Sequence, residues 1–99
     1  MIGYRVLPPA EQEMTEASQF YESKSAGLGL EFLDDVQHVI DSVRQHPKMG
    51  QLIDEELRRA LLHRFPFSLI YAEEPDGILI VAIAHQRRRP GYWKKRVER

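Results

Sequence analysis

Basic and aromatic residues gather toward the C-terminal end of the chain. Residues 85–99 contain seven Lys or Arg and one acidic residue, a local charge of +6, and Arg58, Arg59 and Arg64 add basic charge nearer the middle. Arginine neutralises phosphate groups and aromatic rings stack on bases, so this combination is typical of a surface that binds RNA or another polyanion. The candidate target-binding residues are Arg59, Arg64, His85, Arg87, Arg88, Trp93, Lys94 and Arg96.

Four residues of this region, His85, Arg59, Arg88 and Tyr92, have side chains that could carry out catalysis. In a metal-independent ribonuclease, His85 or Tyr92 would act as the acid or base on the 2′-hydroxyl. Arg59 and Arg88 would hold the charged pentacoordinate phosphate. The alternative interpretation is a solvated C-terminal segment whose arginines pair with acidic residues of the N-terminal helices, because runs of charge usually increase solubility. Trp93 likewise has a second interpretation, as a hydrophobic anchor for that segment.

Other common kinds of site are not supported by the sequence. The chain has no cysteine, and its four histidines do not occur at the i, i+4 spacing of a helical ligand pair, so we predict no metal site and no cofactor. Gly27 and Gly29 separate two predicted helices and do not follow a strand, which disfavours a phosphate-binding loop. No serine lies in a motif that would make it a nucleophile.

The length and composition favour one small domain. Ninety-nine residues suffice for a single core, so we expect one domain over 1–99. The longest apolar run, Ile78 to Ala84, is far shorter than the ~20 residues of a membrane helix. The N-terminus lacks the pattern of a secretory signal, and with no cysteine this favours a cytoplasmic protein. The net charge of −1 conceals an acidic first half, with −4 over 1–50, and a basic second half, with +3 over 51–99.

These residues must be positioned by elements whose periodicity can be read along the chain. Alternating apolar residues predict a strand over 2–6, and apolar spacings of three and four predict a helix over about 9–24 with Glu11, Glu13 and Glu16 on its opposite, polar side. A second stripe from Phe32 to Val43 predicts a helix that ends near His46. Three extended runs follow, at 57–63, 65–73 and 77–85.

Together these elements predict an α+β fold in the order β-α-α-β-β-β. The turn at 74–77 makes the last two strands a hairpin, and the sheet is expected to be mainly antiparallel. The two helices should form an αα-hairpin that packs on the sheet, and the residues after Pro90 a short C-terminal helix or tail.

The last predicted strand is apolar on both sides, which predicts burial of both of its faces. The helical hairpin can cover only one face. The other must be covered by the C-terminal segment with Tyr92 and Trp93, or by another protein chain. The two alternating sets are Ile78, Ile80, Ala82 and Ala84 on one side, and Leu79, Val81 and Ile83 on the other.

Two stretches carry a resemblance to a known family. The first reads Arg59-x-x-Leu-x-Arg-Phe-Pro-Phe-x-Leu-Ile-Tyr71 and the second Ile80-x-Ala-Ile-x-His85-x-x-Arg88-x-Pro90-x-x-Trp93-x-x-Arg96. They resemble the RelE/ParE superfamily of toxins from bacterial type II toxin–antitoxin modules, and the resemblance spans nearly the whole chain.

The resemblance divides between two branches. The RelE-like branch cleaves messenger RNA on the ribosome with basic groups on its sheet, to which Arg59, Arg64, His85 and Arg88 could correspond. Its lysine-rich second helix is missing, because 28–45 contain only Arg44. The Phe-Pro-Phe strand and the His-x-x-Arg-x-Pro-x-x-Trp ending are closer to the ParE-like branch, whose best-known members poison DNA gyrase.

The resemblance therefore implies a ParE-like toxin that inhibits growth, with a role in plasmid stabilisation. Two alternatives remain open: a RelE-like, metal-independent messenger-RNA endoribonuclease, and a non-toxic relative that acts only as an antitoxin-bound DNA-binding corepressor. In each case the resemblance implies a cognate antitoxin and a toxin–antitoxin hetero-oligomer. The arginines would attract an acidic antitoxin segment, and an exposed strand edge could pair with it.

Overall fold

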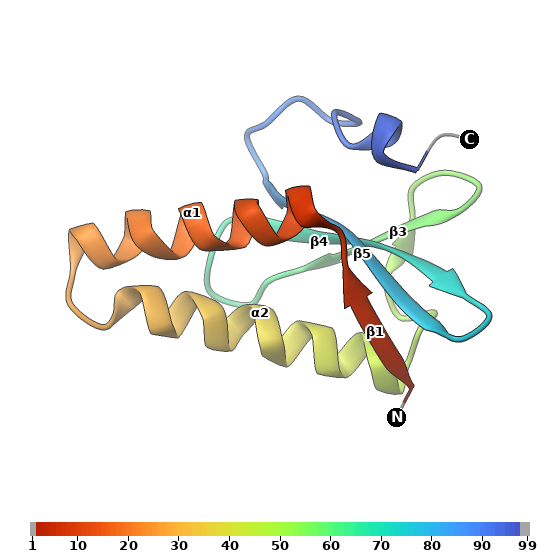
Figure 1. Ribbon diagram of the computed structural model, residues 1–99, viewed down its shortest axis with the longest axis horizontal. Coiled ribbons are helices and arrows are strands. Elements are labelled where there is room, and N and C mark those ends of the chain that lie inside the picture. The colour runs from red at the N-terminus through yellow and green to blue at the C-terminus, as the bar shows by residue number, and fades with distance from the viewer. Residues whose placement is uncertain (1, 98–99) are drawn as a thin grey trace.

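The computed structural model describes residues 2–97 and has the predicted α+β architecture, with two helices packed on a five-stranded sheet (Figure 1). The sheet has the order β1-β5-β4-β3-β2, in which β1 and β5 are parallel and the other neighbours are antiparallel. The elements are β1 (Gly3–Val6), α1 (Pro8–Lys24), α2 (Leu28–Gln45), β2 (Gln51–Leu52), β3 (Leu57–Leu61), β4 (Phe67–Glu74), β5 (Gly77–His85) and a 3₁₀ turn, η1 (Lys94–Arg96).

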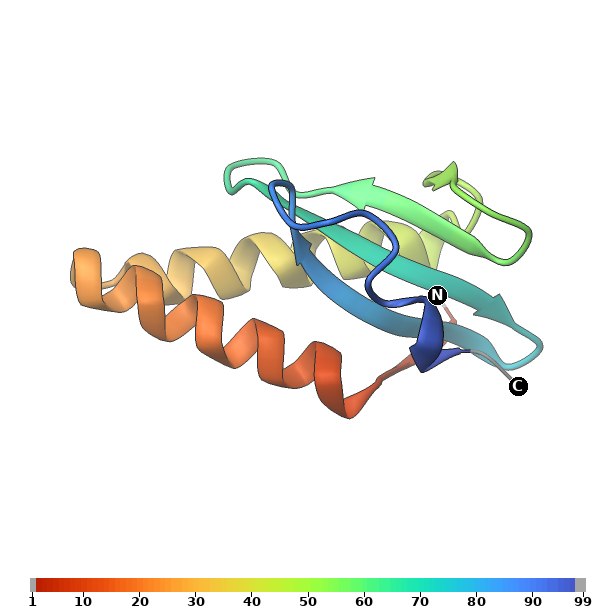
Figure 2. The same cartoon turned by 90° about the horizontal axis from the view of Figure 1, so that it is seen from above.

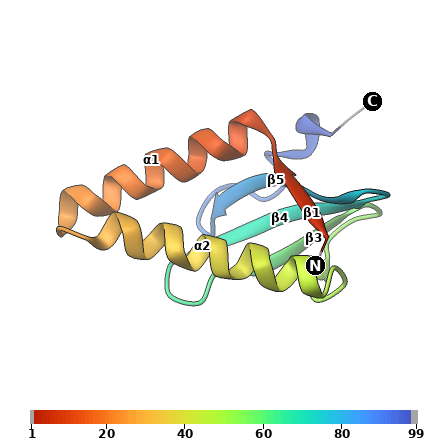
Figure 3. The same cartoon turned by 60° about the horizontal axis from the view of Figure 1, so that its bottom comes forward.

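The helices form an antiparallel hairpin on one face of the sheet (Figure 3). Helix α2 contributes most of the helical core, because its apolar residues recur every three or four positions and face the strands. Helix α1 contributes little fully buried surface besides Ala10. The buried apolar residues of α2 are Phe32, Val36, Val39, Ile40 and Val43.

The C-terminal segment, residues 86–97, crosses the other face of the sheet (Figure 2). Trp93 is only 8% exposed and packs with Leu57, Ile70 and the apolar residues of β5 in a second core. Of the two covers predicted for this face, the structure therefore has the chain's own C-terminal segment. This segment begins as turns and ends in the three-residue η1.

A β-bulge in β5 changes which of its residues face the helices. Ile70 of β4 pairs with Ala82, whereas the next residue, Tyr71, pairs with Ile80, so Val81 is an extra residue in β5. An extra residue shifts the pleat of the strand by one position. The two predicted alternating sets are therefore wrong beyond Val81. Ile83 joins the helix-facing core, and Ala82 and Ala84 join the second core.

The same bulge determines the position of His85 at the end of β5. His85 pairs with Phe67, and the two rings meet edge to face with centroids 5.0 Å apart. Without the extra residue, His85 would continue the opposite face of the strand.

No helix within residues 2–97 is long and apolar enough to cross a membrane.

Candidate functional site

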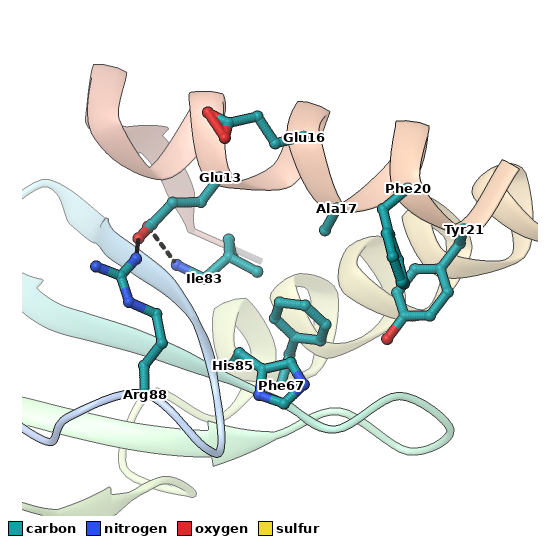
Figure 4. Close-up of a pocket in the computed structure, with 9 residues that line it drawn as sticks. All are labelled: Glu13, Glu16, Ala17, Phe20, Tyr21, Phe67, Ile83, His85 and Arg88. Carbon is teal, nitrogen blue, oxygen red and sulfur yellow. Dashed lines mark hydrogen bonds and ion pairs between the residues drawn. The ribbon is translucent and has the colours of Figure 1, made fainter. Parts of the chain in front are cut away.

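Glu13 of α1 is the centre of the charged cluster that holds the C-terminal segment. Its carboxylate accepts two hydrogen bonds from the guanidinium of Arg96, at 2.9 and 3.1 Å, and one from the hydroxyl of Tyr92. Arg88 Nη1 lies 3.5 Å from Glu13 Oε2 (Figure 4). The Glu13 side chain is only 14% exposed, so these interactions are only weakly screened by water. One carboxylate thus ties α1 to three residues of the C-terminal segment.

This cluster also satisfies the open edge of β5. The pairing of β1 with β5 ends at Val6 and Ile80, so the following residues of β5 have no neighbouring strand on that side. The amide of Ile83 donates to Glu13 Oε1 at 3.1 Å, and Arg96 donates to the carbonyl of Val81 at 3.0 Å. Side chains therefore take the place of a strand along this edge.

Tyr92 lies between charged groups and stays protonated at neutral pH. The Arg88 guanidinium is 3.7 Å from the centre of its ring and that of Arg96 is 5.1 Å away. Burial, and then the hydrogen bond to Glu13, raise the pKa of Tyr92 well above its ordinary value of 10, and the same carboxylate raises the pKa of Arg96. A phenol that already donates to a carboxylate is poorly placed to exchange protons with a substrate.

His85 also takes part in a hydrogen bond, which determines which of its ring nitrogens carries the hydrogen. Its Nδ1 accepts a hydrogen bond of 3.0 Å from the backbone amide of Arg87. In a neutral imidazole the other nitrogen then carries the hydrogen, so Nε2 is a donor. In this tautomer His85 can donate to an anion, but Nε2 is not available as a general base.

Two hollows meet at His85 and Arg88. One, of about 350 Å³, lies between α1 and the end of β5 and has an apolar lining that includes Ala17, Phe20 and Phe67 (Figure 4). The other, of about 260 Å³, lies on the second face of the sheet beside the C-terminal segment. This second hollow, called here the β3–β4 pocket, is lined by Arg59, Leu61, Ser68, Ile70, Ala84, His85, Gln86, Arg88, Pro90 and Trp93.

The structure brings some of the predicted site residues together and separates others. Arg59, His85, Arg88 and Trp93 share the β3–β4 pocket. Arg64 lies outside it, in the loop after β3, with Nη2 3.0 Å from Glu31 Oε1 of α2.

The remaining predicted residues lie on the C-terminal segment. Arg87 and Lys94 are exposed, and Arg96 faces Glu13. The alternative prediction that the C-terminal arginines pair with acidic residues of the first helix is therefore confirmed for Arg88 and Arg96.

Glu13 is the residue that the sequence analysis placed wrongly. It was expected on the polar side of its helix, but it faces β5. Its spacing held a signal, because Glu13 is three positions after the buried Ala10 and four before the half-buried Ala17. A glutamate that is buried at such a position is usually paired. No local pattern identified its partners, which are 70 to 83 residues away.

Within residues 2–97, no group of three or more His, Asp or Glu is arranged to hold a metal ion.

A model of the family described as "ParE toxin of type II toxin-antitoxin system, parDE" matches residues 4–90. The chain therefore belongs to the ParE toxin family.

A solved structure described as the chromosomal ParDE TA system from P. aeruginosa has the same fold. Its TM-score is 0.72 with 19% identity, and the match covers 86% of this chain and 96% of the other. A search of curated proteins gave no significant match.

Proposed function

We propose that this protein is the toxin of a type II toxin–antitoxin module, that it inhibits growth when unopposed, and that a cognate antitoxin neutralises it. Membership of the ParE toxin family over residues 4–90 carries this proposal. The proposed site of action is the cytoplasm. The proposed target is DNA gyrase, because the closer resemblance is to the branch whose best-known members poison it.

The state of the candidate acid and base residues favours a binding toxin over a ribonuclease. Tyr92 donates its hydroxyl to Glu13, and the unprotonated nitrogen of His85 is occupied by the amide of Arg87. A ribonuclease of the kind considered above needs one of these groups free to move a proton. Arg88, one of the two candidate phosphate ligands, is partly neutralised by Glu13.

The hollow between α1 and β5 fits a partner with the chemistry expected of an antitoxin segment. Phe20 is 54% exposed there, so an apolar side chain of the partner could be buried against it. Glu13, Glu16 and Arg88 line the hollow, and the positive charge beside it comes mainly from Arg87 and Arg89, which are exposed in the same loop. An acidic segment with an apolar anchor would match both features.

Expression in cells tests the proposal directly. We expect induction of this chain alone to stop growth, and co-expression of its cognate antitoxin to restore it. With purified protein, we expect inhibition of gyrase supercoiling, and ribosome-bound message that stays intact in the presence of EDTA. Unaffected growth would support the corepressor alternative. Cleavage of the message would support the ribonuclease alternative.

A matched pair of variants tests the antitoxin surface. Phe20→Glu should weaken antitoxin binding at least tenfold, because it puts a negative charge into the apolar hollow opposite an acidic partner. Leu30→Glu makes the same change at a position that is 67% exposed and does not line the hollow, and should have little effect. Equal affinities for the two variants would place the antitoxin elsewhere.

A further inference from the structure

Two histidines that lie far apart in the sequence meet beside α2. His38 belongs to α2 and His63 to the loop of residues 62–66 that joins β3 to β4, and the centres of their rings are 5.1 Å apart. Both residues are exposed. No metal site was predicted from the sequence, because no two histidines have the spacing of a helical pair. Folding nevertheless brings these two together across 25 positions of the chain.

The buried carboxylate of Asp35 fixes the loop that carries His63. Asp35 is only 7% exposed, and its two oxygens accept hydrogen bonds from the backbone amides of His63, at 3.1 Å, and Arg64, at 2.8 Å. An aspartate is seldom buried unless it is paired. Asp35 lies about one turn before His38 in α2, so the same part of the helix carries one ring and holds the backbone of the other. The two rings are therefore positioned before any ligand binds, which lowers the entropic cost of binding.

The charges beside the two rings do not oppose a cation. Arg64 follows His63 directly, but its Nη2 lies 3.0 Å from Glu31 Oε1, so a carboxylate balances its positive charge. Asp35 adds a negative charge at the backbone of His63. Arg64, Glu31 and Asp35 together carry one negative charge, which favours a positively charged ligand at this place.

We propose that His38 and His63 together bind a divalent transition-metal ion such as Zn²⁺, for which imidazole is a suitable ligand. Two imidazoles bound to one tetrahedral ion at about 2.0–2.1 Å have their ring centres roughly 5 Å apart, which matches the 5.1 Å between these rings. None of the hydrogen bonds formed within residues 2–97 uses a ring nitrogen of either residue, whereas Nδ1 of His85 accepts one from a backbone amide.

The pair supplies two of the ligands of the ion. Within residues 2–97 no third His, Asp or Glu completes the set, so water takes the remaining positions. Such an ion links the loop of residues 62–66 to α2 through side chains, in addition to the backbone hydrogen bonds at Asp35. This site does not depend on the proposed toxin activity.

The imidazole resonances of the ¹⁵N-labelled full chain, prepared without a polyhistidine tag, supply the readout. When Zn²⁺ is added, we expect the ring resonances of His38 and His63 to shift together and to saturate at one ion per chain. Those of His46 and His85, the other two histidines, should stay in place. Mg²⁺ should shift none of them, because it prefers oxygen ligands.

Single variants separate the pair from other zinc-binding groups. His38→Gln and His63→Gln should each weaken zinc binding at least tenfold in a calorimetric titration, because each removes one of the two protein ligands. His46→Gln is the matched control, since it removes the same exposed side chain at the end of α2 and should change the affinity no more than twofold.

Thermal melting adds a second readout. Zinc should raise the Tm of the native chain and of His46→Gln, but not that of His63→Gln, because an ion that binds only the folded state stabilises it. The amide spectrum of each variant reports whether it has folded. Ring resonances of His38 and His63 that do not saturate with zinc, or equal affinities for His63→Gln and His46→Gln, would overturn the proposal.

Discussion

At the scale of the residue, the placement of Glu13 has the largest consequences for the charge pattern. Two of the five arginines in residues 85–99, Arg88 and Arg96, are engaged at one carboxylate, that of Glu13. Arg59 is left without an acidic partner within residues 2–97. The effective positive charge is therefore on Arg59 and on the exposed loop with Arg87, and less on the residues nearest α1.

Replacement of Glu13 by alanine should lower the free energy of unfolding by about 2–3 kcal/mol, because it leaves the partly buried Arg96 guanidinium and the Ile83 amide without their acceptor. Urea unfolding followed by Trp93 fluorescence measures this. Glu16→Ala, an exposed position of the same helix, should change stability by no more than about 0.5 kcal/mol. A similar loss in both variants would mean that the cluster adds nothing beyond helix propensity.

At the scale of the element, the helical hairpin depends on a close approach of its two helices. Gly29 lies in the first turn of α2, and a Cβ atom there would be 2.5 Å from the backbone carbonyl oxygen of Ser18 in α1. Glu22 of α1 accepts hydrogen bonds from the amides of Gly27 and Gly29, at 2.9 and 3.0 Å, and so caps the start of α2. The junction that separates the two helices, with Gly27 and Gly29, therefore also fixes the distance between them.

The substitution Gly29→Ala should destabilise the protein by about 1–3 kcal/mol, because the helices must separate to accept the methyl group. Alanine is otherwise favoured over glycine within a helix by roughly 1 kcal/mol, and this gain opposes the loss caused by the separation of the helices. Gly3→Ala provides the comparison, since no atom lies within 4 Å of a Cβ atom at that position. Thermal melting followed by circular dichroism should show a lower Tm for Gly29→Ala and a nearly unchanged Tm for Gly3→Ala. An unchanged Tm in both would contradict the close approach.

At the scale of the whole molecule, the C-terminal segment completes the fold. It covers the second face of the sheet through Trp93, and Glu13 holds it to α1. The segment that bears half of the exposed Lys and Arg residues within 2–97 is thus also a structural layer. A partner that contacts Arg87 or Lys94 meets a surface whose position is set by the two cores beneath it.

Trp93→Ala should reduce the free energy of unfolding by about 3–5 kcal/mol, because it removes the largest side chain of the second core and leaves a cavity. That is a large fraction of the about 5–15 kcal/mol of a typical domain. Trp93→Phe keeps most of the packing and removes the indole N–H, which has no acceptor within residues 2–97, so we expect a loss below about 1.5 kcal/mol. Urea unfolding followed by circular dichroism measures both. If Trp93→Ala unfolds at the same urea concentration as the native chain, the segment is not part of the core.

Much of the fold could be predicted from the sequence because local periodicity reports local structure. The helix predicted over 9–24 spans 8–24, and the strand predicted at 77–85 has those bounds in the structure. Within that strand the faces could not be predicted beyond Val81, because the bulge arises from pairing with β4 and leaves the apolar pattern unchanged. The same limit applies to the site. Arg59, His85, Arg88 and Trp93 were identified by residue type, but the spacing along the chain does not show that they share a pocket.

The sequence by itself determined the order of the two helices and the four longer strands, but not the short β2. It also determined the burial of both faces of the last strand, the division into an acidic and a basic half, and the resemblance to the RelE/ParE toxins. Only the tertiary structure decided which cover closes the second face and which arginines keep their charge. Periodicity and composition act over a few residues, whereas Glu13 and Arg96 are 83 positions apart. Whether a charge is neutralised depends on the groups within a few ångströms of it, and those groups are brought together only by folding.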